Sequence, residues 1–150
     1  MEPERTLVLL KPDCIQRGLV AKVLARFEKK GLQIVGMKMI HMSKEQSRGH
    51  YEAHVERDFY PELEAFITGS PVIALVLEAP RAITVVRSIV GDTAGYEAAS
   101  GTIRGDYSMS NCSNLVHASD GAESAKKETA FFFDESELFS YSLAGAKWNG

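Results

Sequence analysis

Two uninterrupted aliphatic runs constrain the fold of this chain most. The segments "LVLL" at 7–10 and "VIALVL" at 72–77 contain no polar residue, and neither alternates between apolar and polar positions. A strand with one face in water shows such alternation, whereas an unbroken aliphatic run is typical of a strand buried on both faces. We therefore expect two strands that lie centrally in a sheet or are covered on both sides.

Helix signals separate these runs. Apolar side chains recur at helical spacing over residues 19–30, and Gly31 supplies a stop. The stretch "SKEQ" at 43–46 has the Ser-x-x-Gln form of a capping box. Further helices are expected from Pro61 to the glycine at position 69, and over residues 81–90 before Gly91.

The remaining segments complete the order of elements. Residues 32–42 have strand-like spacing, and "NLVH" at 114–117 predicts a short strand. Residues 91–113, directly before this last strand, contain four glycines and little periodicity, and ordered loops of this length are often functional. Ser119 or Asp120 can cap a last helix that runs to about residue 132.

This order contains the β-α-β-β-α-β pattern of a ferredoxin-like sandwich. The fold class is therefore α+β, with an antiparallel four-stranded sheet and helices packed on it. An extra helical hairpin and a long loop before the last strand are added to that pattern. At 150 residues, a single domain over 1–150 is expected, and its C-terminal tail at about 134–150 extends past the core.

The composition does not support a broad electrostatic partner. The net charge is -3 at pH 7, so no chain-wide basic excess exists to attract nucleic acid or an anionic membrane. The N-terminus "MEPERTLVLLKPD" is acidic, and its four-residue aliphatic run fits neither a signal peptide nor a membrane span. We expect a cytoplasmic protein in which locally placed cations meet any anionic ligand.

No metal site is indicated by residue spacing. Cys14 and Cys112 lie far apart and form no CxxC pair, so two reduced thiols are expected. In "HYEAH", His50 and His54 have the spacing of a zinc pair on a probable helix. Glu52 is not where HExxH requires it and no third ligand is evident, so a plain exposed helix is the favoured interpretation.

Cations stand at the edges of several predicted elements. The sequence has no Walker A loop and no GxGxxG, so a nucleotide would have to be held by side-chain cations. Lys11 follows the first strand, Arg87 lies in the helix over 81–90, and Arg104 lies in the long loop. A lysine combined with arginines suits a triphosphate, although each residue alone is most often a solvated surface charge.

Two aromatic side chains have competing interpretations. From spacing alone, Phe59 is more often a core residue than the lip of a slot for an aromatic ligand. His117 stands just before a predicted helix start, where an unprotonated imidazole nitrogen could act as a nucleophile and backbone N–H groups favour an anion. From position alone, a neutral core histidine bonded to backbone is the commoner case.

Sequence blocks along most of the chain carry a combined signal. The blocks are "ERTLVLLKPD", "GLVAKVLARFEKKGL", "HYEAH", "FITGSPVIALVLE", "VVRSIVGDT", "GTIRGDY" and "NLVHASDGAESAKKE". From about Glu4 to Phe133 these blocks resemble, in the same order, the nucleoside diphosphate kinase family, and the N-x-x-H-[GA]-S-D block is highly specific.

This resemblance implies a ping-pong phosphotransferase. The γ-phosphate of a nucleoside triphosphate, mainly ATP, would pass to His117 as a pros-phosphohistidine and then to a nucleoside diphosphate such as GDP. Mg2+ is implied as the cofactor, held mainly by nucleotide phosphates rather than by protein side chains. The family also implies a homo-oligomer, with a hexamer favoured over a tetramer.

Site residues follow from the same resemblance. Catalytic roles are implied for His117, Glu128, Lys11, Tyr51 and Ser119. Glu128 would hold the second ring nitrogen of the histidine, and Ser119 would support that pair. Contacts to nucleotide phosphates, sugar or base are implied for Lys11, Phe59, Leu63, Arg87, Thr93, Arg104 and Asn114. For Phe59 the resemblance implies base stacking, which reverses the interpretation from spacing.

The chain departs from the family pattern in two places. "NCS" at 111–113 stands where Val-Gly-Arg is common, so one wall of the base pocket becomes polar and nucleotide preference is open. Ala94 and Gly95 replace a common Asn-Pro, and Ser100 replaces a common proline, in a loop that lies between subunits in the family. Since glycine loosens the backbone where proline fixes it, these changes bear on oligomer stability.

Two other classes of function remain as alternatives. A non-catalytic nucleotide-binding module would be expected to have lost chemical residues, yet His117, Lys11, Arg104 and Glu128 are present. A nucleic-acid binder could use a ferredoxin-like sheet, and a salt-dependent shift with single-stranded DNA would distinguish it.

Overall fold

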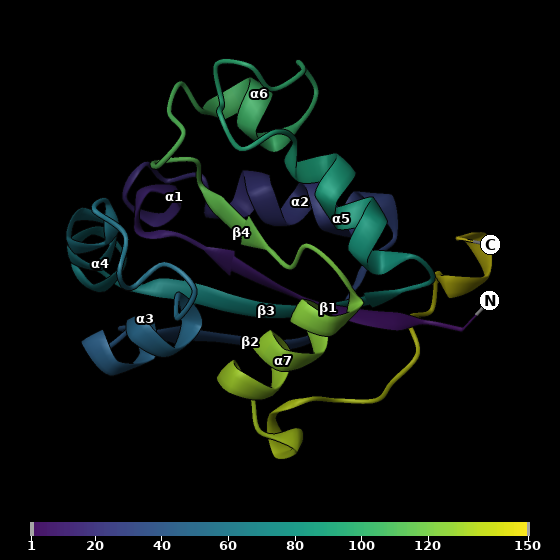
Figure 1. Cartoon of the computed structure of the whole chain (residues 1–150). Helices are drawn as coiled ribbons and strands as arrows, with labels where there is room; N and C mark the ends of the chain where they lie inside the picture. Colours follow the sequence, from purple (N-terminus) through teal and green to yellow (C-terminus); the bar gives the residue numbers. More distant parts are fainter. Residues whose placement is uncertain (1, 150) are drawn as a thin grey trace.

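The computed structural model describes residues 2–149 and has one four-stranded antiparallel sheet in the order β2-β3-β1-β4 (Figure 1). The two aliphatic runs lie in the central strands β1 and β3, as predicted. Antiparallel pairing in this order is that of the ferredoxin-like sandwich, so the predicted fold class is confirmed. The strands are β1 (Glu4–Leu10), β2 (Gln33–Ile40), β3 (Val72–Ala79) and β4 (Val116–Ala118).

The four predicted helices before the long loop are present. Gly31 ends one of them at φ 103°, a left-handed conformation that glycine adopts without steric cost. Ser43 forms the predicted capping box with Gln46. The helices are α1 (Pro12–Gln16), α2 (Val20–Lys30), α3 (Lys44–His50), α4 (Tyr60–Thr68), α5 (Ala82–Val90), α6 (Ile103–Tyr107) and α7 (Ala122–Phe132).

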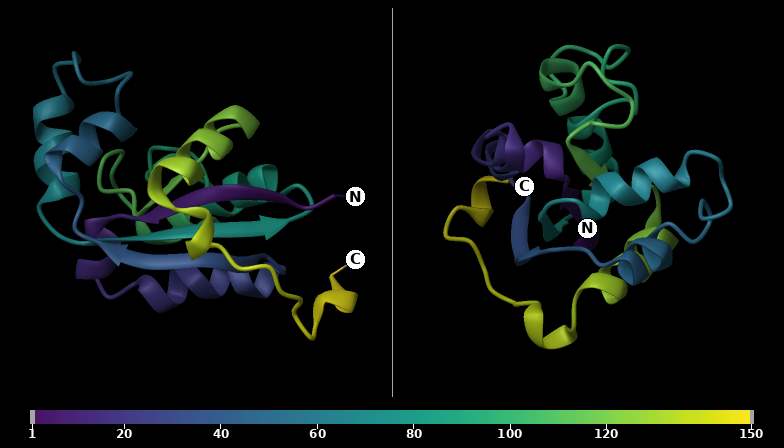
Figure 2. Two further views of the ribbon diagram at one scale, coloured as in Figure 1. Left: turned by 90° about the horizontal axis from the view of Figure 1, so that it is seen from below. Right: turned by 90° about the vertical axis from the view of Figure 1, so that its left-hand side faces the viewer.

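Apolar side chains on the two faces of the sheet form separate cores. Along β1, Val8 and Leu10 pack with residues of α2 and α5, whereas Leu7 and Leu9 pack with residues of α4 and α7. Figure 2 shows α2 and α7 on opposite sides of the sheet. Both faces of β1 are therefore buried, which explains why its aliphatic run has no alternation.

Some predicted boundaries are wrong. The helix α3 ends at His50 and residues 51–59 form turns, so His50 and His54 do not lie on one helix. The last strand begins at Val116 rather than at position 114. The short helices α1 and α6 were not predicted, and α6 interrupts the predicted loop over 91–113.

The predicted cap of the last helix is also wrong. The helix α7 begins at Ala122, and Gly121 is its N-cap residue. The Ser124 hydroxyl accepts a hydrogen bond from the Gly121 N–H at 3.1 Å and donates one to Asp120 at 2.6 Å. Ser119 does not cap this helix, and its hydroxyl has a different hydrogen-bond partner in the active site.

The C-terminal tail returns along the sheet. The Phe139 N–H donates to the Val35 carbonyl at 2.9 Å, and the Gln33 side chain donates to the Tyr141 carbonyl at 2.7 Å. Trp148 remains 80% exposed.

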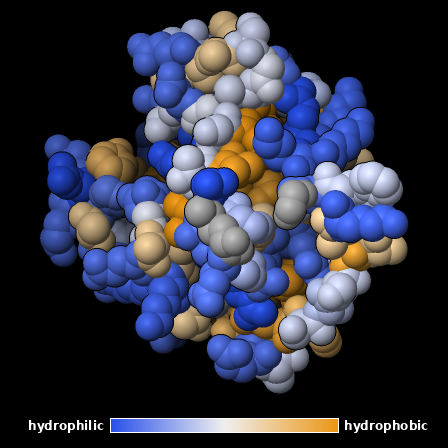
Figure 3. Space-filling view, turned by 90° about the vertical axis from the view of Figure 1, so that its right-hand side faces the viewer, coloured by the Kyte–Doolittle hydropathy of each residue, from blue (hydrophilic) through white to orange (hydrophobic). Residues whose placement is uncertain are grey.

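The face that carries the chain ends is largely hydrophilic, with apolar residues visible mainly towards its centre (Figure 3). Among residues 2–149, no helix has the length and apolarity needed to cross a bilayer.

Candidate active site

One cavity of about 880 Å³ brings together residues from the helices α3, α4, α5, α6 and α7, from β4 and from the segments that connect them. Ten of the eleven residues that the sequence analysis assigned to the site line it, and Ser119 lies directly behind it. Spacing alone could not have shown this, because these residues are spread over 118 positions of the chain. The ten are Lys11, Tyr51, Phe59, Leu63, Arg87, Thr93, Arg104, Asn114, His117 and Glu128.

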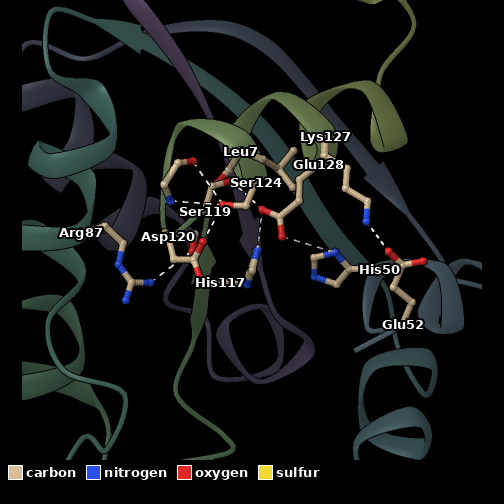
Figure 4. A network of polar contacts seen from close by, with 12 residues as sticks. Leu7, His50, Glu52, Arg87, His117, Ser119, Asp120, Ser124, Lys127 and Glu128 are labelled. Carbon is tan, nitrogen blue, oxygen red and sulfur yellow. Dashed lines mark hydrogen bonds and ion pairs between the residues drawn. The ribbon is translucent and has the colours of Figure 1, made fainter. Parts of the chain in front are cut away.

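The imidazole of His117 is held by a carboxylate. Its Nε2 lies 3.1 Å from Glu128 Oε1, and the Ser119 hydroxyl donates to the same oxygen at 2.5 Å (Figure 4). An ionised carboxylate only accepts hydrogen bonds, so Nε2 carries the proton and Nδ1 keeps its lone pair. The arrangement leaves Nδ1 as the nucleophilic nitrogen of the ring.

The charge on Glu128 is supported by these bonds. Burial of this carboxyl raises its pKa, but the hydrogen bonds from His117 and Ser119 outweigh burial and leave the pKa below its ordinary value. Glu128 is therefore ionised at neutral pH. It can both fix the ring and offset positive charge that develops on it.

The backbone before His117 is strained and tied to β1. Leu115 adopts φ 74°, which is unfavourable for a residue with a branched side chain. The Asp13 carboxylate accepts from the Leu115 N–H at 3.0 Å, and the Lys11 N–H donates to the Leu115 carbonyl at 2.9 Å. These bonds fix the point where the chain enters β4, and so place His117 opposite Leu9 of β1.

Lys11 is a buried cation at the end of β1. Its ammonium donates to the Asn114 side-chain carbonyl at 2.7 Å. Burial and then the positive charge of Arg104 lower the pKa of Lys11 to about 8, although Asp13 and Cys112 act in the opposite direction. A phosphate in the cavity would be met by a largely protonated ammonium at pH 7.

The two arginines are held by backbone carbonyls. Arg104 donates to the carbonyls of Asn114, Gly91 and Val116 at 3.2, 3.1 and 2.6 Å. Burial and then Arg87 lower the pKa of this guanidinium to about 10, so it stays charged at neutral pH. A guanidinium has five N–H groups, and those left over can meet an anion. Arg87 donates to the Ala118 carbonyl at 3.2 Å.

Asn114 links the loop to these cations. Besides accepting from Lys11, its side-chain amide donates to the carbonyls of Thr93 and Asn111 at 2.9 and 3.2 Å. Asn114 is buried. Both N–H groups of the amide are therefore used within the protein, and its oxygen positions Lys11.

The mouth of the cavity is aromatic. Phe59 is 51% exposed, so the core placement favoured by its spacing is wrong. Its ring lies 5.7 Å from that of His54, and Leu63 lies beside it on the cavity wall. Asn111 and Cys112 also line the cavity. An exposed ring of this kind offers a flat apolar surface to a planar ligand.

The placement of His50 was not predicted from the sequence. The side chain is only 2% exposed, and its ring packs edge-on against that of His117 with centroids 4.6 Å apart. The histidine was noticed in "HYEAH", but its partner proves to be His117 rather than His54. Contact between residues 67 positions apart leaves no periodic signal in a sequence.

Comparison with known proteins identifies the family. A sequence model described as nucleoside diphosphate kinase matches residues 4–138. The chain belongs to the nucleoside diphosphate kinase family. A nucleoside diphosphate kinase from Rhodopirellula baltica is 56% identical over 140 residues, which cover 93% of this chain and 92% of that protein. One from Pyrococcus horikoshii is 49% identical over 150 residues, covering 98% and 95%.

Solved structures agree with this assignment. The halophilic nucleoside diphosphate kinase from Halobacterium salinarum, solved in complex with CDP, has a TM-score of 0.95 and 40% identity, and the match covers 99% of each chain. A nucleoside diphosphate kinase family protein from Babesia bovis has a TM-score of 0.94 and 39% identity, with all of both chains covered. The kinase family has the ferredoxin-like fold seen here, and the protein is a phosphotransferase.

Proposed function

We propose that this nucleoside diphosphate kinase transfers the γ-phosphoryl group of a nucleoside triphosphate, mainly ATP, through a phosphohistidine on Nδ1 of His117. The observation that carries this is the hydrogen bond between His117 Nε2 and Glu128, which leaves the Nδ1 lone pair available. Attack by Nδ1 forms a bond to the γ-phosphorus and breaks its bond to the β-phosphate oxygen, so the diphosphate leaves. A second nucleoside diphosphate then takes the phosphoryl group by the reverse step.

The cations of the cavity would act on the phosphates. Phosphoryl transfer depends on positioning and on neutralising charge spread over the transferring oxygens. Lys11, Arg87 and Arg104 line the same cavity as His117, and their positive charges are available at neutral pH. Tyr51 and Thr93 line it too and would contact phosphate or sugar, while Ser119 supports Glu128.

Mg2+ would enter on the nucleotide. Among residues 2–149, one group of metal-ligand side chains lies close together, and it consists of His50, His117 and Glu128. Mg2+ prefers oxygen ligands and keeps several waters, so this nitrogen-rich group does not suit it. Bound together with the nucleotide, Mg2+ would supply positive charge that offsets the charge of the phosphates.

Transfer of label tests the mechanism. The purified protein is mixed with Mg2+ and γ-labelled ATP, freed of nucleotide, and assayed for acid-labile label before and after unlabelled GDP is added. We expect label on the protein that moves into GTP. A folded protein that binds ATP but takes up no label would contradict the proposal.

Titration of Lys11 predicts a pH dependence. Because the pKa of this ammonium is about 8, the group loses its charge as pH rises through 8. We expect kcat/KM for ATP, which reports the unphosphorylated, nucleotide-free enzyme, to fall between pH 7 and pH 9. Lys11→Arg should lower the rate but flatten the profile, since arginine stays charged. A Cys112→Ser control changes a neighbouring cavity side chain and leaves Lys11 in place, so it should keep the parent profile, and a flat parent profile would refute the assignment.

The position of Asn111 in the cavity leads us to expect a preference for adenine nucleotides. Its side chain lines the cavity whose mouth holds Phe59, where a base would stack. A carboxamide can pair with N6 and N7 of adenine at once. We expect Asn111→Val to lower kcat/KM for ADP by roughly 5–10-fold, about 1 kcal/mol, and to change GDP, CDP and UDP less. An unchanged ranking of the four diphosphates would rule out this role.

The family also suggests an assembly and a compartment. We propose a cytoplasmic homo-oligomer, a hexamer rather than a tetramer. Exposed apolar side chains on β2 and in the tail support association, namely Met37, Met39, Tyr141 and Trp148. Sedimentation velocity should show one species near six times the chain mass of 16.5 kDa. A stable tetramer would point to the altered loop at Gly95 and Ser100.

A further inference from the structure

The buried histidine beside the proposed nucleophile has no use in the mechanism above. Both ring nitrogens of His50 are buried, and neither has a hydrogen-bond partner. Buried polar atoms normally have partners, and an exception needs an explanation such as a missing ligand. His50 Nδ1 lies 3.9 Å from Glu128 Oε2, too far for a hydrogen bond (Figure 4).

Three potential metal ligands converge at this point. One donor atom each from His50, His117 and Glu128 lies within 4.8 Å of the other two. The shortest separation, from His117 Nε2 to Glu128 Oε1, is 3.1 Å. Ligands of a tetrahedral zinc ion, at about 2.0–2.2 Å from the metal, lie roughly 3.3 Å apart. Small rotations of the side chains would bring the three donors to that spacing.

We propose that His50, His117 and Glu128 form an inhibitory site for a borderline divalent transition-metal ion such as Zn2+. Two imidazoles and one carboxylate are a common protein ligand set of zinc, and they leave the fourth position to water. The site lines the cavity, so an ion can enter without opening the fold.

Occupation of this site and phosphorylation of His117 exclude each other. A neutral imidazole has one lone pair on a ring nitrogen and one N–H. Metal binding at Nε2 takes the lone pair there and moves the proton to Nδ1, which then cannot attack phosphorus. Conversely, attack by Nδ1 gives a ring that is protonated on Nε2, and as long as this proton stays in the bond to Glu128 the nitrogen has no lone pair for a metal ion. The inhibition of phosphorylation rests on the proposed function, whereas the binding of the metal ion does not.

Calorimetry with Zn2+ alone tests the site. Nucleotide-free enzyme in a non-chelating buffer is titrated with zinc chloride, and we expect one ion per chain. His50→Phe keeps an aromatic ring against Tyr51, His117 and Phe132 but removes both nitrogens. It should weaken binding at least about tenfold, the lower end of what loss of even an outer-shell partner costs a metal site. His41→Gln, which changes a histidine outside the cavity, should bind like the parent.

Two results would overturn the site. Unchanged affinity in His50→Phe would exclude His50 as a ligand, and loss of binding in Cys112→Ser would assign the ion to that thiol. If His50→Phe does not fold, the parent labelled with 15N-histidine replaces it. Zinc should then shift the ring nitrogens of both His50 and His117, and shifts confined to other histidines would refute the proposal.

A labelling experiment separates this inference from the proposed function. The enzyme is incubated with one equivalent of Zn2+, and acid-labile label from γ-labelled ATP with excess Mg2+ is then measured. We expect label to fall with zinc occupancy and to return after chelation. Bound zinc with undiminished label would refute the inhibition while the kinase mechanism stands. Bound zinc with no label even in metal-free enzyme would refute the mechanism and leave the metal site.

Discussion

His117→Gln is expected to abolish phosphoryl transfer and to leave the fold intact. The change removes Nδ1, the nitrogen that the bond between Nε2 and Glu128 leaves free to attack, so kcat should fall on the order of 10⁵-fold or more, as when other catalytic nucleophiles are removed. The glutamine amide can still donate to Glu128, and the pairing of residue 117 with Leu9 uses backbone groups only. We therefore expect a parent-like melting temperature with no acid-labile label.

The matched control is His41→Gln. This histidine is exposed and bonds the Thr68 carbonyl, away from the cavity. It should retain both the label and the steady-state rate. Label retained in His117→Gln would show that another group carries the phosphoryl, and loss of activity in the control would point to a general effect of histidine loss.

Patterns local in sequence predicted most of the fold. The aliphatic runs identified β1 and β3 because burial on both faces excludes polar residues, and Ser43 and Gly31 marked helix ends through their own chemistry. The short helix α6 was not predicted, because contacts with residues distant in the sequence stabilise it. Its Asp106 pairs with Arg26 of α2 at 2.6 Å, 80 positions away.

The site itself was predicted by resemblance rather than by spacing. From sequence position alone, Lys11 and Arg104 were each expected to be a solvated surface charge, yet both are buried. Phe59 was expected in a core, yet it is exposed. The resemblance implied both the pairing of His117 with Glu128 and reaction at Nδ1, and the hydrogen bond between Nε2 and Glu128 gives the physical reason for that choice of nitrogen. Only the fold could show that His50 faces His117.

Removal of the Glu128 carboxylate should give the second largest effect. Glu128 fixes the proton on His117 Nε2, and its charge offsets the positive charge that the ring gains as Nδ1 bonds to phosphorus. We expect Glu128→Ala to lower kcat on the order of 10³–10⁴-fold, as for the orienting carboxylate of a catalytic triad. Because Glu128 contacts the ring rather than the nucleotide, KM should change little.

Variants of the same network separate charge from orientation. In Glu128→Gln the amide oxygen can still accept from both His117 and Ser119, so only the charge is lost and kcat should fall less, about 10²-fold. Ser119→Ala removes one hydrogen bond, which has a net value near 1 kcal/mol, and should cost about tenfold or less. Pre-steady-state labelling by ATP gives the rate of the chemical step for each variant. Equal losses in Glu128→Gln and Glu128→Ala would assign the whole effect to charge, whereas parent-like labelling in Glu128→Ala would mean that His117 is oriented without it.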